Sequence, residues 1–154
     1  MLVKDIMTHD VKATTVDAKI RDVAMIMCFK LRHKVSGLPV VDDNGRIVGV
    51  ISEKDILNTM FPKLGEYVDG QNLPNFEVLE KDYRDVLNLK VSDLMSKRVT
   101  TVPPDMPVLQ AASIMANRKF RRVPVAENGK LVGIVSIGDV HRAIFQEATL
   151  GEFS

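Results

Sequence analysis

Residues 36–57 read SGLPVVDDNGRIVGVISEKDIL, and residues 121–140 read RRVPVAENGKLVGIVSIGDV. Both stretches contain Pro-Val, then Asn-Gly, then Gly-x-x-Ser-x-x-Asp, and from Asn44 and Asn128 onward they match without a gap. An internal repeat defines the structural unit of a chain and shows which residue types each copy keeps. The shared residues are polar as well as apolar, so they include candidates for binding as well as for the core.

Shorter matches extend the repeat. VKDIM at residues 3–7 returns as VSDLM at residues 91–95. We therefore predict a first copy at residues 1–60, an insertion at 61–90, a second copy at 91–145 and a tail at 146–154. A copy of roughly 60 residues buries too little surface to be robust alone, so we expect the two copies to share one core. The other matched pairs are Thr14-Thr15-Val16 with Thr100-Thr101-Val102, Asp17 with Asp105, and Ala24-Met25-Ile26-Met27 with Ala112-Ser113-Ile114-Met115.

Each copy has the pattern of a β-α-β-β-α unit, which makes the chain an α/β (α+β) protein. A β-hairpin is indicated in each copy by an Asn-Gly pair between two apolar runs, because both residues of that pair accept positive φ. A helix should follow each hairpin, starting at Ser52 and at Ser136, and a short strand is expected at Ala13 to Val16. The apolar runs of the hairpins are Leu38 to Val41 with Ile47 to Ile51, and Val123 to Val125 with Leu131 to Val135.

Apolar residues at helical spacing predict another helix before each hairpin. We expect Asp17 to cap or charge the first turn of the helix in the first copy. Proline is tolerated only in the first turn of a helix, so Pro107 predicts that the helix of the second copy begins near Met106. The spaced residues are Ile20, Val23, Ala24, Met27 and Leu31 in the first copy, and Val108, Ala111, Ala112 and Met115 in the second.

The insertion breaks the repeat. Pro62, Gly65, Gly70 and Pro74 punctuate a polar stretch, after which helical spacing resumes over residues 79–87. The insertion could lie across the two copies or reach toward a partner, and the residues alone leave both arrangements open.

The composition excludes several classes of protein. Hydrophobic residues make up 45% and charged residues 27% of the 154 residues, and the formal net charge of +1 disfavours a nucleic-acid partner. No apolar run is long enough to span a bilayer, and the N-terminus has no leader pattern, so we expect a cytoplasmic protein without a membrane partner. Cys28 is the single cysteine. It lies among apolar residues, and we expect it to pack as a small hydrophobic side chain.

No residue set supplies a nucleophile, a base and a stabilising group together, so we expect no catalytic residues and no enzyme. His9, His33 and His141 lack metal-ligand spacing, which predicts no metal site. We interpret the methionines at 25, 27 and 115 as core or dimer surface.

The two Asn-Gly stretches, together with VKDIM and VSDLM, resemble the cystathionine β-synthase domain, or CBS domain. The resemblance implies two copies packed as one pseudo-two-fold module, commonly with an adenine nucleotide or S-adenosylmethionine bound between the copies. Proteins of this kind act as sensors, often as dimers of modules. The implied ligand is AMP, ADP or ATP, with S-adenosylmethionine and NAD as further adenosine-containing candidates, and no catalytic cofactor is implied.

Ser52 with Asp55, and Ser136 with Asp139, allow two interpretations. The first is a capping box, in which serine and acid satisfy the free N–H groups of a helix start. The second is a ligand site, because a helix start favours phosphate and an ionised carboxylate can accept both ribose hydroxyls. We expect both interpretations to hold, with the acids on ribose and the serines near phosphate.

The resemblance extends the candidate sites to the segments before Pro-Val, whose backbone groups would meet the adenine edge, and to the threonine regions that would flank the base. The first-copy candidates are Thr15, Ser36, Gly37, Leu38, Pro39, Ser52, Lys54 and Asp55. The second-copy candidates are Thr101, Arg121, Arg122, Val123, Pro124, Ser136 and Asp139.

The two sites differ in charge. Arg121 and Arg122 could reach phosphate as always-charged forks, or they could be a solvated basic loop. If they reach phosphate, the second site should prefer the more phosphorylated ligand. The first site would have Lys54, and Lys34 or His33, as its nearby cations, and would take adenosine-like or singly phosphorylated ligands or stay empty.

Two functions follow. The leading hypothesis is a regulatory module that senses an adenosine-containing ligand, forms a homodimer and signals to a separate client protein. The alternative is a ligand-free dimerisation or scaffold module in which the serine and acid residues act only as caps.

Overall fold

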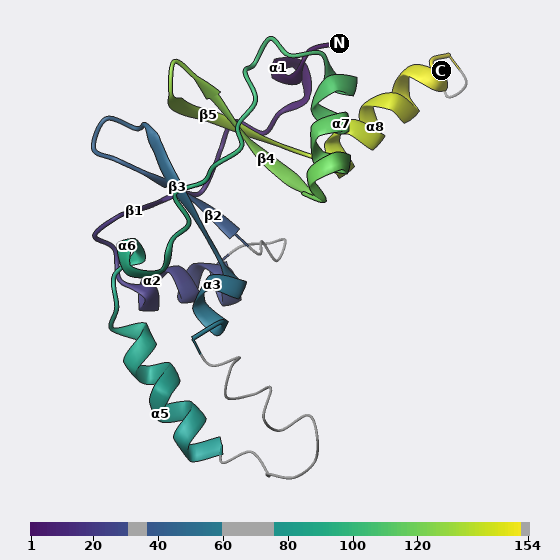
Figure 1. Ribbon diagram of the computed structural model, residues 1–154. Coiled ribbons are helices and arrows are strands. Elements are labelled where there is room, and N and C mark those ends of the chain that lie inside the picture. Colours follow the sequence, from purple (N-terminus) through teal and green to yellow (C-terminus); the bar gives the residue numbers. More distant parts are fainter. Residues whose placement is uncertain (31–36, 60–75, 152–154) are drawn as a thin grey trace. The chain divides into compact units, whose positions relative to one another are not determined.

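The computed structural model describes residues 1–30, 37–59 and 76–151 of the chain (Figure 1). The chain divides into two compact units. The first-copy unit comprises residues 13–43 and 48–99, and the second-copy unit comprises residues 1–12, 44–47 and 100–154. The expected mixture of helices and strands is confirmed in both units.

The first-copy unit is built on a three-stranded sheet in the order β1-β2-β3. Strand β1 pairs in parallel with β2, which aligns Thr14 with Val40 and Thr15 with Val41. The elements of this unit are β1 (Thr14–Thr15), α2 (Ile20–Met25), a π-helix (Ile26–Lys30), β2 (Gly37–Val41), β3 (Ile47–Ser52), α3 (Glu53–Leu57), α5 (Phe76–Leu87) and α6 (Val91–Leu94).

The second-copy unit is built on the antiparallel pair β4–β5, beside which α7 and α8 lie (Figure 1). Its turn adopts the left-handed conformation that the sequence predicts, with φ of 53° at Asn128 and 82° at Gly129. Val102 adds a parallel bridge to Val125 on the other edge of β4. The elements are α1 (Val3–Ile6), α7 (Val108–Arg118), β4 (Arg122–Glu127), β5 (Lys130–Ser136) and α8 (Ile137–Ala148).

The copies exchange their opening segments, VKDIM at 3–7 and VSDLM at 91–95. Val3 is fully buried in a cluster whose other members come from the second copy. Val91 is fully buried among residues of the first copy, together with Val86 of α5. The two clusters are Val3, Val102, Val108, Ala111, Met115, Val123, Val125, Val135 and Val140, and Ile20, Val23, Met27, Leu38, Val40, Ile51, Ile56, Val86 and Val91.

The prediction of one shared core is therefore wrong in that form. The buried apolar residues of the described parts form two clusters, each of which draws on both copies. A single copy buries too little apolar surface on its own, and each unit gains more by packing one helical turn from the other copy.

Two glycines allow the opening segments to approach the sheets. A Cβ atom on Gly133 of β5 would lie 2.7 Å from Sδ of Met7 and 2.9 Å from the carbonyl oxygen of Thr8. A Cβ on Gly49 of β3 would lie 2.8 Å from the carbonyl oxygen of Ser96 and 3.0 Å from Sδ of Met95. Such separations leave no room for a side chain, so a glycine is needed at both positions.

Backbone hydrogen bonds fasten the opening segments at these points. The N–H of Thr8 donates to the carbonyl of Ile134 at 2.8 Å, and the N–H of Ile134 donates back at 2.9 Å. Val50 and Ser96 make the same reciprocal pair, with both distances at 2.9 Å. Each opening segment is thus paired to the strand that leads into the capped helix of its unit.

Three local predictions need correction. Helix α7 begins at Val108 with Pro107 as its N-cap, rather than near Met106, because Pro107 stays in an extended conformation with ψ of 139°. Asp17 does not cap α2, whose N-cap is Lys19; its carboxylate instead lies 3.8 Å from Nζ of Lys90. Cys28 is exposed rather than packed as a core residue.

Cys28 lies in the π-helix, on the flank of the apolar stripe. Val23 and Met27 keep the stripe buried, whereas Cys28 and Phe29 are exposed, Phe29 by 80%. Leu31, the last residue of the predicted stripe, lies outside the described residues.

Helix α5 is the described part of the insertion. It packs on α2, and its Val86 is 7% exposed within the first-copy unit. Burial raises the pKa of Tyr83 on the same helix, and the charges of Cys28 and Glu53 raise it further. The helix therefore completes the first-copy unit. Within the described parts of the chain, no helix is long and apolar enough to cross a bilayer.

Candidate functional site

The start of α8 is a complete capping box. Ser136 is the N-cap, and its Oγ accepts a hydrogen bond of 3.0 Å from the N–H of Asp139. Oδ2 of Asp139 accepts a bond of 2.9 Å from the N–H of Ser136. The first interpretation of these two residues is therefore confirmed.

The start of α3 repeats this geometry in the other unit. Oγ of Ser52 accepts from the N–H of Asp55 at 3.2 Å, and Oδ2 of Asp55 accepts from the N–H of Ser52 at 2.8 Å. Both serines and both acids are half-buried, so each acid lies partly within its unit while remaining within reach of solvent. A carboxylate held this way keeps lone pairs for further donors.

The segment before Pro-Val lies beside each helix start. Arg122 is directly opposite Ser136 in the β4–β5 ladder, and the carbonyl of Arg121 accepts a 2.9 Å bond from the N–H of Ile137. In the first-copy unit, a Cβ on Gly37 would lie 3.9 Å from Cα and Cβ of Ser52. Strand end and helix start thus lie next to each other in each unit.

The side chains of this surface divide into buried and accessible ones. Leu38 and Val123 are each 1% exposed, and their side chains belong to the core clusters of their units. Pro39 is buried, and the carbonyl of Pro124 already accepts a 3.1 Å bond from the N–H of Val102. Arg121, Arg122 and Lys54 are exposed and remain available for an anion. Ser36, with Lys34 and His33, lies outside the described residues.

The predicted equivalence of Thr15 and Thr101 is wrong. Val40 and Val125 are equivalent in the two copies. Val40 pairs with Thr14, and Val125 pairs with Val102. The residue equivalent to Thr14 is therefore Val102, so Thr101 lies one residue before this position and Thr15 one residue after it. Matching the letters Thr-Thr-Val misaligned the two strands. The threonines lie beside the sheets, but at different positions along them.

One charged residue near Asp139 did not emerge from the sequence. Nη1 of Arg142, one turn further along α8, lies 3.3 Å from Oδ1 of Asp139. Its side chain is 67% exposed and that of Asp139 is 16% exposed. The signal was the Asp-x-x-Arg spacing, which places the two side chains on one helix face. In the first copy the same position is Asn58.

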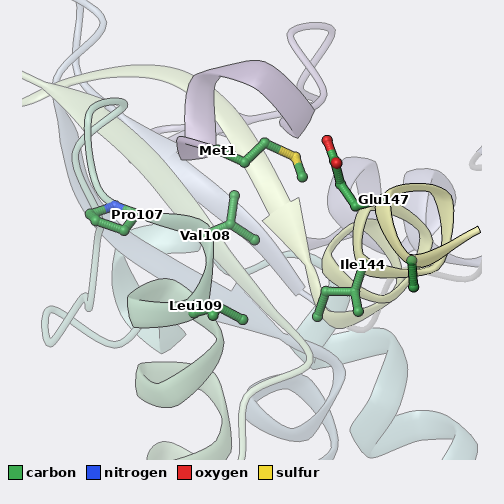
Figure 2. Close-up of a pocket in the computed structure, with 7 residues that line it drawn as sticks. Met1, Pro107, Val108, Leu109, Ile144 and Glu147 are labelled. Atoms are coloured by element: carbon green, nitrogen blue, oxygen red, sulfur yellow. The ribbon is translucent and has the colours of Figure 1, made fainter. Parts of the chain in front are cut away.

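A second feature of the second-copy unit is an apolar pocket between α7 and α8, with a volume of about 520 Å³ (Figure 2). None of the capping-box residues lines it. The lining residues are Met1, Pro107, Val108, Leu109, Ile144, Glu147 and Ala148.

Met115 and Met27 are buried, so these two methionines belong to the core.

No group of acids, histidines or cysteines suited to a metal ion occurs among the residues that the structure describes. The candidate site itself presents carboxylate and hydroxyl oxygens at two helix starts, with exposed arginines beside the start of α8. This set suits a ligand that carries hydroxyls and an anion.

Comparison with known proteins identifies the family. The model of the CBS domain matches residues 3–61 and again residues 91–146. The protein MJ1426 of Methanocaldococcus jannaschii is 33% identical over 94% of this chain and 91% of its own length. The chloroplastic CBS domain-containing protein CBSX2 of Arabidopsis thaliana is 35% identical over 75% of this chain, but only 52% of its own length is covered.

Solved structures agree with this family. CBSX2 in complex with AMP superposes with a TM-score of 0.71 and 30% identity, over 96% of this chain and 98% of that one. The CBS domain pair of MJ0100, in complex with 5′-methylthioadenosine and S-adenosyl-L-methionine, has a TM-score of 0.67 and 25% identity, over 94% and 99%. The chain belongs to the CBS domain family and carries its domain as a tandem pair.

Proposed function

We propose that this chain is a non-catalytic regulatory module of the cytoplasm that binds an adenosine-containing ligand and passes the signal to a separate client protein. The observation that carries the proposal is the repeated surface in which a capping-box acid lies beside a strand end, once in each unit. It is supported by the complexes of similar CBS pairs with AMP, 5′-methylthioadenosine and S-adenosylmethionine.

The proposed contacts follow from the chemistry of each residue. Asp55 and Asp139 accept the ribose hydroxyls, since an ionised carboxylate only accepts. The helix start of α8 and the exposed Arg121 and Arg122 stabilise phosphate in the second-copy unit. Lys54 is the exposed cation among the described candidates of the first-copy unit. The second-copy unit therefore takes the more phosphorylated ligand.

Regulation requires that the ligand bind two arrangements of the protein unequally. A tenfold preference, about 1.4 kcal/mol, is enough for a useful shift in population. That preference also limits the size of the signal, because a ligand shifts an equilibrium only by its difference in affinity.

A panel of AMP, ADP, ATP, NAD and S-adenosylmethionine tests the proposal by thermal shift. A ligand present at about a hundred times its dissociation constant should stabilise the protein by roughly 2.7 kcal/mol. GTP and CTP are the matched controls, since they carry the same phosphates on other bases. Mass spectrometry of small molecules released from fresh protein then identifies a ligand that copurifies. No shift with any adenosine compound, and none copurified, would leave the ligand-free scaffold as the function.

The apolar pocket favours a second, compatible function, which is homodimerisation. Leu109 of α7 is 66% exposed and Ile144 of α8 is 45% exposed, although both are large apolar residues. They border the pocket together with Met1, which is 53% exposed. We propose that a second copy of the chain covers this surface, since contiguous exposed apolar surface marks interaction sites.

Leu109→Glu and Ile144→Glu should convert a dimer to a monomer. Each change would bury an unpaired charge in the interface, which costs several kcal/mol and exceeds what a single contact can offset. Size-exclusion chromatography with light scattering measures the mass, and Gln110→Glu is the control because Gln110 is an exposed neighbour on α7. A wild-type monomer, or a dimer that persists in both variants, rules out this interface.

A further inference from the structure

The carboxylate of Asp139 has a protein partner on each oxygen. Oδ2 accepts from the N–H of Ser136 at 2.9 Å, and Oδ1 faces Nη1 of Arg142 at 3.3 Å. Only the first of these contacts is part of the capping box. The second is an ion pair whose arginine is 67% exposed, so it can be broken without unpacking the helix.

The guanidinium of Arg142 has donors to spare. An arginine carries five N–H donors, and the described residues provide an acceptor for one of them, at Oδ1 of Asp139. The arginine side of this ion pair is exposed, and ion pairs open to solvent add little to stability, so exchanging this partner for another anion costs little. A phosphate would offer the planar fork a bidentate, charge-assisted partner, which is stronger than the single contact.

The first-copy unit lacks this arrangement. Asn58 stands where Arg142 stands, and Oδ2 of Asp55 has the same capping bond from Ser52. Within residues 1–30, 37–59 and 76–151, no donor is seen on Oδ1 of Asp55. Hydroxyl groups could therefore reach this oxygen without displacing a cation.

We propose that Arg142 determines ligand class in the second-copy unit, by making the release of Asp139 depend on a phosphate. This inference rests on the proposed function. A phosphorylated ligand draws the guanidinium away and frees Oδ1 for the ribose hydroxyls, so the arginine keeps an anionic partner and the carboxylate keeps hydrogen-bond donors. A nucleoside without phosphate must compete with Arg142 for the carboxylate. The unit thereby selects adenine nucleotides against adenosine.

The test compares ATP with adenosine by isothermal titration calorimetry. All variants carry Asp55→Asn, which weakens binding in the first-copy unit. Arg142→Gln should lower the affinity for ATP by about tenfold, the loss expected for a charge-assisted bond to phosphate. The affinity for adenosine should stay the same or rise, because Arg142 no longer competes for Asp139. The affinity of Arg142→Lys for ATP should lie between those of the wild type and Arg142→Gln. Arg118→Gln is the control for the loss of an exposed arginine in the same unit.

The outcomes separate the two proposals. An ATP-to-adenosine affinity ratio that falls in Arg142→Gln and holds in Arg118→Gln supports the role of Arg142. Two results overturn the role of Arg142 while ATP still binds, and both leave the proposed function standing. In the first, Arg142→Gln leaves the ATP-to-adenosine affinity ratio unchanged. In the second, Arg142→Gln and Arg118→Gln lower that ratio equally. Failure of both compounds to bind the chain without Asp55→Asn overturns this inference, and the proposed function falls with it only if the other adenosine compounds of the panel also fail to bind.

Discussion

Gly133→Ala is expected to lower the free energy of unfolding by about 2–3 kcal/mol, at the upper end of the range for overpacking. The added methyl would lie 2.7 Å from Sδ of Met7 and 2.9 Å from the carbonyl oxygen of Thr8. Met7 can move, but Thr8 is held by its paired backbone bonds to Ile134, so the opening segment itself must shift. Chemical denaturation measures the loss.

Gly138→Ala is the matched control, because Gly138 lies five residues further along the same unit and its added methyl would come no closer than 3.6 Å to a neighbour. Within a helix, alanine is favoured over glycine by roughly 0.5–1 kcal/mol, so this variant should be more stable than the wild type. Gly49→Ala should repeat the loss in the first-copy unit. Equal stability of Gly133→Ala and the wild type would mean that the opening segment does not lie against β5.

Asp139→Ala is expected to have two separate effects. It removes the cap bond of 2.9 Å to Ser136, which should lower the free energy of unfolding by about 0.5–2 kcal/mol. If Asp139 also accepts from the ribose, the binding free energy should weaken by about 1–3 kcal/mol, a loss in ligand affinity of roughly 5- to 150-fold. Denaturation of the ligand-free protein measures the first effect, and calorimetry with ATP measures the second.

Asp5→Ala separates these effects. Oδ2 of Asp5 accepts from the N–H of Leu2 at 2.8 Å, so Asp5 caps α1 of the same unit without belonging to the candidate site. This variant should lose stability on the scale of a cap and bind ATP as the wild type does. Equal affinity for ATP in Asp139→Ala, Asp5→Ala and the wild type would show that Asp139 is a cap and nothing more.

The parts of the fold that the sequence predicts correctly are those with a local cause. Asn128-Gly129 forms a tight turn because both residues accept positive φ, and Ser136 caps α8 because serine and an acid three residues later satisfy free N–H groups. Each of these causes lies within a few residues of its effect. The repeat then carries the same prediction to Ser52 and Asp55.

Two of the errors have long-range causes. Nothing near Val3 indicates that it packs with the second copy, because an apolar residue reveals that it is buried but not against what. The pairing of Thr14 with Val40 was likewise invisible, since strand register depends on residues far apart in the chain. The other two have local causes. Cys28 has apolar neighbours in the sequence but lies on the flank of the apolar stripe, so those neighbours do not indicate that it is buried. The pairing of Arg142 with Asp139 has a signal in the sequence, the Asp-x-x-Arg spacing, but an exposed arginine at that spacing does not by itself indicate a binding role.

The exchange of opening segments bears on how such a chain could have arisen. A single copy holds a sheet and two helices, but the turn that completes its apolar cluster comes from its twin, as Val3 and Val91 do here. An ancestor with one copy could complete its apolar cluster only by exchanging that turn with a second molecule. Fusion of two such genes would have placed the exchange within one chain, and loss of either copy would then leave the apolar cluster of the other incomplete.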